Sequence, residues 1–208
     1  MDAKETNEIK TAKREARAKA RRALLALSAA ERKSQSQKAA ASFLDSSIYK
    51  GAECVAAFCS MPDEVDTLPV LEQAARDGKK ILLPRVIAGS NAMDFYELAA
   101  PVLVLQDLEA QTEANAWGIR EPLLSLPRVP KESVPAKTAI LVPGLAFAKD
   151  GRRLGRGKGF YDRYLSELLA ANNAFAREGK ICGYCMASQI AANIPTQDND
   201  FFMQALFY

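Results

Sequence analysis

The stretch VPGLAFAKDGRRLGRGKGFYDRYL, residues 142–165, says more about fold and chemistry than any other part of this sequence. Gly155, Gly157 and Gly159 alternate in it with Arg156 and Lys158, and a helix is expected directly afterwards. Glycine lets backbone N–H groups approach an anion closely. The start of a helix adds unpaired N–H donors and a partial positive charge. The stretch therefore predicts a site for a phosphorylated ligand.

The glycine segment, residues 155–159, matches neither of the two familiar phosphate-binding motifs. A P-loop needs Ser or Thr after Lys158, and a dinucleotide fingerprint needs glycine in place of Phe160. The plainer alternative is a glycine-rich turn that carries solvated cations. We favour phosphate binding. Asp162, in the first turn of the expected helix, is placed to hold a divalent ion beside phosphates, so the expected ligand is a nucleoside triphosphate with Mg²⁺.

Three further features each have a functional interpretation and a structural one. Lys13 and Arg17 share one helix face and could clamp a polyphosphate, although for an isolated helix a solvated basic face is favoured. Asp198 and Asp200 could hold Mg²⁺, but their spacing alone favours a turn. Trp117 could stack on an aromatic ligand or anchor a loop, and the sequence leaves these alternatives equal.

Length and composition suit one domain with a sizeable core, because 49% of the 208 residues are hydrophobic and 25% are charged. A net charge of +3 fits small anionic ligands and is too small for a bulk nucleic-acid binder. No apolar run approaches membrane-spanning length, and the acidic start MDAKETNE is unlike a secretory signal. We therefore expect a cytoplasmic protein; organellar import stays open, because an Arg- and Ala-rich stretch follows.

Histidine is absent from the sequence. This excludes Ser-His and Cys-His nucleophiles, histidine-containing metal sites and imidazole acid–base chemistry. An enzyme of this composition must work by electrostatics and positioning, with carboxylates, Lys or Tyr for any proton transfer.

Hydrophobic periodicity predicts helices and strands that alternate along the chain with short connections. Helices are expected over 9–27, 28–44, 68–76 and 160–171, and strands over 53–60, 80–86, 93–98, 137–142, 180–185 and 205–208. Residues 106–133 are expected to be mostly loop, with a short helix near 103–109. The alternation predicts a three-layer α/β/α fold with a mostly parallel, Rossmann-like sheet. We expect one domain over 1–208, with the N-terminal helices of 1–45 packed on it.

Two of the expected helices carry start signals. Ser28 and Glu31 have the spacing of a capping box. Thr67 is expected to cap the helix over 68–76, which Gly78 would close.

The four cysteines do not suggest a disulfide scaffold in a chain of this length. Cys182 and Cys185 look like a redox C-x-x-C pair, but they fall in an expected strand, where residues three apart point to opposite faces. Joined with Cys54 and Cys59 they would form only a loosely spaced zinc site. Buried structural cysteines are the favoured interpretation.

Residues 143–165, PGLAFAKDGRRLGRGKGFYDRYL, closely resemble the signature of the 5-formyltetrahydrofolate cyclo-ligase family, roughly P-G-x-x-F-D-x-x-G-x-R-L-G-x-G-x-G-Y-Y-D. Similarity continues along the chain in KREAR (13–17), SAAER (28–32), SMPDEVDT (60–67), WGIREP (117–122) and IPTQDND (194–200). The sequence departs from the family pattern at Cys59, Ala148, Lys149, Phe160 and Gln204. None of these departures removes a phosphate-binding element; Cys59 and Phe160 bear on fine substrate contacts.

The resemblance implies an ATP- and Mg²⁺-dependent enzyme that closes 5-formyltetrahydrofolate to 5,10-methenyltetrahydrofolate and releases ADP and phosphate. Arg156 and Lys158 would stabilise the transferring phosphoryl group, and Asp162 and Asp200 would hold Mg²⁺. The implied ATP-binding residues are Lys13, Arg17, Arg153, Leu154, Gly155, Arg156, Gly157, Lys158, Gly159, Phe160 and Tyr161. The implied folate-binding residues are Cys59, Glu64, Trp117, Arg156, Gly157, Lys158, Gly159 and Phe160.

Three other functions stay open beside this one. The chain could be an anion-binding module without catalysis on the same scaffold. It could be a thiol-based redox or zinc protein, or its basic first helix could contact RNA, which would require strongly salt-dependent binding. With the cyclo-ligase interpretation we expect a monomer whose partners are small molecules, without nucleic acid or membrane.

Overall fold

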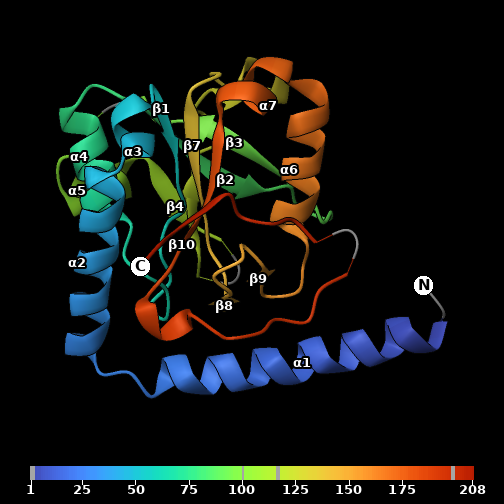
Figure 1. The fold of residues 1–208 in the computed structure, drawn as a ribbon. Helices are drawn as coiled ribbons and strands as arrows, with labels where there is room; N and C mark the ends of the chain where they lie inside the picture. The colour runs from blue at the N-terminus through green and yellow to red at the C-terminus, as the bar shows by residue number, and fades with distance from the viewer. Residues whose placement is uncertain (1–2, 100, 116–117, 198–199) are drawn as a thin grey trace.

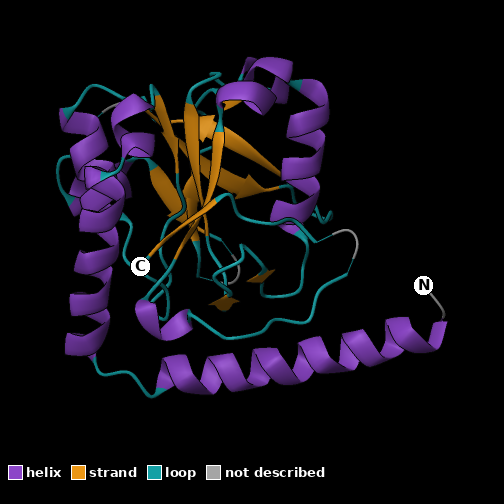
Figure 2. Cartoon of the chain, in the orientation of Figure 1, coloured by secondary structure: helices purple, strands orange, loops and turns teal. Residues whose placement is uncertain are grey.

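Seven strands form the central sheet of the computed structural model, which describes residues 3–99, 101–115, 118–197 and 200–208. The strands are β1 (Cys54–Ala56), β2 (Lys80–Val86), β3 (Met93–Glu97), β6 (Arg128–Val129), β7 (Thr138–Val142), β10 (Lys180–Tyr184) and β11 (Ala205–Phe207). Their order is β11-β10-β7-β1-β2-β3-β6. The first five in this order run parallel; at one edge β3 pairs antiparallel with β2, and β6 pairs antiparallel with β3. The predicted mostly parallel sheet is therefore confirmed (Figure 2).

Helices cover both faces of the sheet, which gives the predicted three layers (Figure 1). One face carries α2 (Ala29–Asp45), α3 (Ser47–Gly51), α4 (Leu68–Arg76) and α5 (Leu105–Ala110). The other face carries α6 (Phe160–Ala171) and α7 (Asn173–Glu178).

The strands alternate their side chains between two buried clusters, one under each helix layer. Val55 and Leu141 pack with Phe43 of α2, whereas Ile140 packs with Leu165 of α6. This alternation follows from the two-residue period of a strand.

The cysteines obey the same rule. Cys182 lies in the cluster under α2 and Cys185 in the cluster under α6, so the two thiols diverge as predicted. All four cysteines are buried and free, and burial raises the pKa of each to about 12. A redox thiol needs the opposite shift. Structural burial is therefore confirmed.

Helix α1 (Ala3–Leu25) crosses the end of the sheet at which the parallel strands finish (Figure 1). Ala16 and Ala20 of this helix pack against a small cluster that contains Leu154 and Ile194. The predicted capping box at the start of α2 is present: the Glu31 N–H donates to Ser28 Oγ at 3.2 Å, and the Ser28 N–H donates to Glu31 Oε2 at 2.8 Å.

Thr67 occupies the N-cap position of α4, as predicted, but its side chain makes no capping hydrogen bond. Its hydroxyl instead donates to the Phe58 carbonyl at 2.6 Å, and Asp66 Oδ1 accepts the Leu68 N–H at 2.9 Å. Thr67 is thus used to tie the loop after β1 to the start of α4.

Residues 106–133, expected to be mostly loop, also contain regular structure beyond the predicted short helix. They form β4 (Thr112–Ala114), β5 (Arg120–Pro122), β6 and the 3-10 helix η1 (Lys131–Ser133). The hairpin of β8 (Ala146–Phe147) and β9 (Arg153–Leu154), helix α7 and the 3-10 helix η2 (Ala187–Gln189) were not predicted either. Strands of two or three residues are too short to show a periodic pattern.

Over the described residues, no helix combines the length and the apolarity that crossing a membrane would need.

Candidate active site

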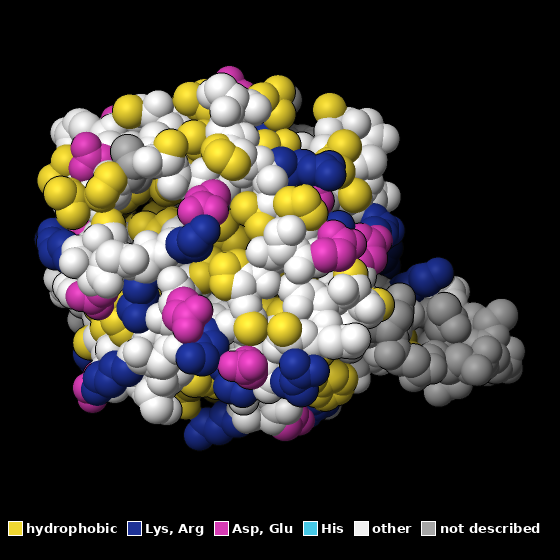
Figure 3. Space-filling model, turned by 90° about the horizontal axis from the view of Figure 1, so that it is seen from above, with side chains coloured by type: hydrophobic (Ala, Val, Ile, Leu, Met, Phe, Trp, Pro, Cys, Tyr) yellow, Lys and Arg dark blue, Asp and Glu magenta, His cyan; other side chains and the backbone are white. Residues whose placement is uncertain are grey.

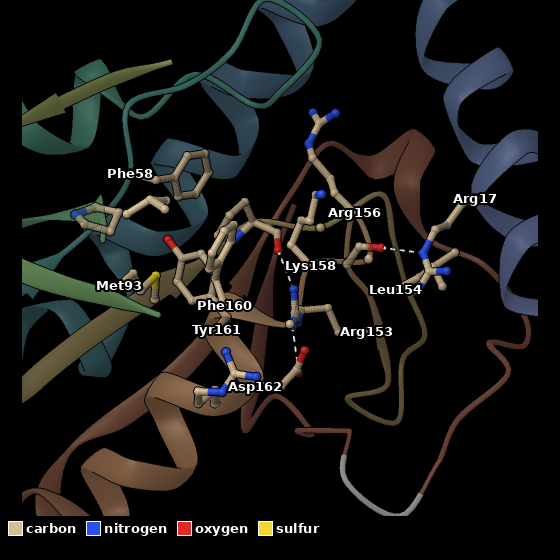
Figure 4. Close-up of a pocket in the computed structure, with 18 of the residues that line it drawn as sticks. Arg17, Phe58, Met93, Arg153, Leu154, Arg156, Lys158, Phe160, Tyr161 and Asp162 are labelled. Carbon is tan, nitrogen blue, oxygen red and sulfur yellow. Dashed lines mark hydrogen bonds and ion pairs between the residues drawn. The ribbon is translucent and has the colours of Figure 1, made fainter. Parts of the chain in front are cut away.

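A cavity of about 910 Å³ opens at the carboxyl ends of β1, β2 and β7. Helix α1, the loop after β1 and the glycine segment form its walls (Figure 4). Every implied ATP, folate and metal residue except Trp117, which lies outside the described residues, lines this cavity. At the opposite end of the molecule, cationic and acidic side chains are interspersed over the surface (Figure 3).

The three glycines of the glycine segment are needed for two different reasons. Gly157 and Gly159 have φ angles of +105° and +73°, in the left-handed region that side chains disfavour. Gly155 has an ordinary φ, but a Cβ there would lie 2.8 Å from Nη1 of Arg153. The segment thus turns sharply and lets an arginine lie against its backbone before α6 begins.

Arg153 and Arg17 anchor the glycine segment from two sides. Arg153 is buried and donates to the Pro143 carbonyl at 3.1 Å and to Asp162 Oδ1 at 2.8 Å. Its Nε is buried without a partner among the described residues. Arg17 reaches across from α1 and donates to the Gly155 carbonyl at 3.0 Å. Burial and the neighbouring Arg21 lower the pKa of Arg17, so the site concentrates positive charge.

Lys158 differs from the arginines because it is exposed and makes no ion pair with any described residue. It projects from the glycine segment at the cavity (Figure 4). Its ammonium group is therefore free to meet an incoming anion.

The two carboxylates implied as metal ligands, Asp162 and Asp200, belong to two segments that a hydrogen bond joins. The Phe201 N–H donates to Asp162 Oδ1 at 3.4 Å, and Asp200 directly precedes Phe201. Asp200 pairs with buried Lys13 at 2.5 Å and accepts the Gln197 N–H at 2.7 Å. In the described part of the chain, no group of three or more metal-binding side chains occurs. A pair of carboxylates fits Mg²⁺, which uses one or two carboxylates together with phosphate oxygens and water.

An acidic pair faces Arg156 on the opposite wall, in the loop after β1. Arg156 Nη2 lies 2.8 Å from Asp63 Oδ1 and 3.1 Å from Glu64 Oε1, and Arg156 Nε lies 3.2 Å from the same Glu64 oxygen. Burial alone would lower the pKa of Arg156, but Asp63 and Glu64 outweigh it and raise the pKa. Burial also raises the pKa of Glu64, although Arg156 and the Met61 N–H oppose this.

The raised pKa of Glu64 predicts a pH dependence of stability. The ordinary pKa of a glutamate is 4.5. Between that pH and its raised pKa in the native protein, Glu64 keeps its proton in the native state and loses it in the unfolded chain. Stability contributed by this proton is therefore full below pH 4.5 and is lost as pH rises through the native pKa. We expect the free energy of unfolding of the unmodified protein, relative to Glu64→Gln, to fall from about pH 4.5 upward. Urea unfolding in steps up to pH 7 measures the difference; a flat or rising difference would contradict the assignment.

The remaining wall is mostly apolar and suits a flat ring system. Phe58, Met61, Pro84 and Met93 line it together with Cys59. The Tyr161 hydroxyl is buried there without a described partner, and its burial raises the pKa of that hydroxyl. The Cys59 thiol and the Tyr161 hydroxyl therefore stay neutral, and they offer hydrogen bonds rather than charge to a ligand.

Several lining residues were not singled out from the sequence. They are Lys10, Arg21, Phe58, Met93, Ile119, Arg120, Glu121, Arg163, Ser166 and Gln197. Five of them had a usable signal, because they lie in segments that carry the family resemblance: Ile119, Arg120 and Glu121 in WGIREP, Arg163 in the stretch 143–165 and Gln197 in IPTQDND. Buried Glu121 accepts the Val86 N–H at 3.1 Å and so holds β5 against the end of β2.

Comparison with known proteins gives a consistent result. The 5-formyltetrahydrofolate cyclo-ligase family model matches residues 9–208. A 5-formyltetrahydrofolate cyclo-ligase from Mus musculus is 32% identical over 204 residues, with 96% of this chain and 95% of that protein covered. One from Escherichia coli K12 is 30% identical over 159 residues, which cover 74% of this chain and 77% of that protein. The NMR structure of Aquifex aeolicus 5,10-methenyltetrahydrofolate synthetase superposes with a TM-score of 0.72 at 30% identity, and the match covers 94% of this chain and 88% of that one.

Proposed function

This chain belongs to the 5-formyltetrahydrofolate cyclo-ligase family, and on that basis we propose that it uses ATP and Mg²⁺ to convert 5-formyltetrahydrofolate into 5,10-methenyltetrahydrofolate, ADP and phosphate. One observation carries the proposal. A single cavity gathers a glycine-rich turn, unpaired and paired cations, two carboxylates and an apolar wall from segments far apart in the sequence.

The nucleotide would lie along the glycine segment. Lys13 and Arg17 would contact its phosphates from α1, and the backbone of residues 153–161 would follow the triphosphate, with the start of α6 adding N–H donors. Asp162 and Asp200 would hold Mg²⁺, which when bound screens the phosphate charges and orients them. Lys13 and Arg153, which now pair with these carboxylates, are the cations that would turn to phosphate.

The folate would lie against the apolar wall between Cys59 and Phe160. Glu64 is the candidate for hydrogen bonds to the donor edge of the pterin, because it lines the cavity and its side chain is buried. Phe160 keeps the ring of the usual family tyrosine without its hydroxyl.

The chemistry solves the problem that a formamide is a poor electrophile. The formyl oxygen attacks the γ-phosphorus of ATP, an oxygen–phosphorus bond forms, and the bond to ADP breaks. N10 of the same molecule then attacks the activated carbon with the advantage of proximity. N10 loses its proton, the carbon–oxygen bond breaks with its electrons, and phosphate leaves a methenyl bridge.

Arg156 and Lys158 are the residues we propose for charge stabilisation during phosphoryl transfer. Such transfer needs little covalent help from a protein, since positioning and neutralisation of the equatorial oxygens supply most of the catalysis. This requirement agrees with a sequence that contains no histidine.

The proposal is tested by leaving out one component at a time. We expect the methenyl absorbance band to appear only when 5-formyltetrahydrofolate, ATP and Mg²⁺ are all present, with one ADP released for each methenyl group. Tight ATP binding without ADP or methenyl formation would instead support an anion-binding module without catalysis.

A further inference from the structure

Arg156 is held on the acidic wall of the cavity rather than beside the other cations. Its guanidinium makes three contacts of 2.8–3.2 Å with Asp63 and Glu64. In Figure 4 it points away from Arg153 and Asp162. A phosphoryl group transferred beside Asp162 therefore lacks this cation unless the guanidinium swings across.

The two acids that hold Arg156 are not equivalent. Glu64 is buried, with 8% of its side chain exposed, and its other oxygen accepts the Met61 N–H at 3.1 Å. Asp63 has 29% of its side chain exposed, and Arg156 is its sole recorded polar partner among the described residues. Asp63 thus contributes to the site only through Arg156.

Resting on the function proposed above, we infer that Asp63 is a positioning residue that, with Glu64, holds Arg156 away from the phosphoryl group until folate occupies the cavity. The donor edge of a pterin competes for Glu64 Oε1, the oxygen that Arg156 uses for two contacts. The ion pair that remains joins two partly exposed side chains, and such pairs contribute only about 0–1 kcal/mol. Folate binding therefore frees Arg156 to reach the transferring group.

This arrangement protects ATP from water. In the absence of folate, a water oxygen can attack the γ-phosphorus, the bond to the ADP oxygen breaks, and ADP, phosphate and a proton are released. With Arg156 held by both acids, that transition state lacks one of its stabilising charges. Glu64 and Asp63 together make phosphoryl transfer depend on the correct acceptor.

The test compares ADP release without folate to methenyl formation with folate. Asp63→Asn removes the charge that holds Arg156 and leaves Glu64 intact. We expect it to raise folate-independent ADP release about two- to fivefold, the effect of one partly exposed ion pair. Asp66→Asn is the matched control from the same loop, because Asp66 caps Leu68 and makes no recorded contact with Arg156. Asp66→Asn is expected to leave the ratio of folate-independent ADP release to methenyl formation unchanged.

A second measurement uses the unmodified enzyme. Salt weakens a partly exposed ion pair, so folate-independent ADP release at saturating ATP should rise with ionic strength, and Asp63→Asn should lose this dependence. Asp63→Glu keeps a carboxylate near Arg156. Its ratio of folate-independent ADP release to methenyl formation should stay close to that of the unmodified enzyme.

Unchanged folate-independent ADP release in Asp63→Asn, with no salt response in the unmodified enzyme, would overturn the inference. This outcome differs from failure of the proposed function itself. In that case the unmodified protein would form no methenyl product under any condition.

Discussion

Replacing Lys158 by alanine is expected to lower kcat by about 10²-fold or more, while the free energy of unfolding changes by less than about 0.5 kcal/mol. Lys158 is exposed, lines the cavity and pairs with no described residue, so its loss breaks no structural contact. Methenyl formation followed by absorbance gives the first quantity, and urea unfolding gives the second.

Lys149→Ala is the matched control for this prediction. Lys149 is also exposed, lies in the same part of the sequence and does not line the cavity. It should keep both turnover and stability. Near-normal turnover of Lys158→Ala would remove Lys158 from the phosphoryl-transfer step. A fall in turnover that comes with a large fall in the free energy of unfolding would mean that the role of Lys158 is structural.

Replacing Arg153 by methionine is expected to lower the free energy of unfolding by about 3 kcal/mol, as for other buried ion pairs that lose one partner. The Arg153 side chain is 5% exposed and joins the Pro143 carbonyl to Asp162, so the variant removes the cation that pairs with Asp162 and a donor to the Pro143 carbonyl. Urea unfolding at neutral pH measures the loss. Turnover should fall as well, because the glycine segment lies against this side chain.

Arg76→Met supplies the comparison on the surface. Arg76 pairs with Glu72 at 3.6 Å, and 51% of its side chain is exposed. The cost there should be no more than about 0.5 kcal/mol. If Arg153→Met were as mild as Arg76→Met, the buried pair would not hold the glycine segment in place.

Long periodic segments were predictable from sequence because their signals are local. Helices α4 and α6 and strand β2 begin and end at the predicted residues, 68–76, 160–171 and 80–86. The capping box at Ser28 was predictable for the same reason: its partners are three residues apart. The family resemblance, which the family match confirms, was likewise carried by short local motifs, above all by the contiguous stretch 143–165.

What the sequence did not reveal depends on contacts between distant segments. Strands of two or three residues, such as β6, exist because a neighbouring strand pairs with them. The pairing of Arg156 with Asp63 and Glu64 joins residues more than 90 positions apart. No local pattern indicates which wall of a cavity an arginine faces, and that choice underlies the inferred role of Asp63.

The most direct test of the account follows the formyl oxygen itself. The proposed chemistry forms a bond between this oxygen and the γ-phosphorus and later breaks its bond to carbon, so the oxygen must leave with phosphate. We expect 5-formyltetrahydrofolate labelled with ¹⁸O at the formyl group to yield phosphate that carries one ¹⁸O atom per methenyl group formed, as measured by mass spectrometry. Unlabelled phosphate accompanying methenyl formation would contradict phosphorylation of the formyl oxygen.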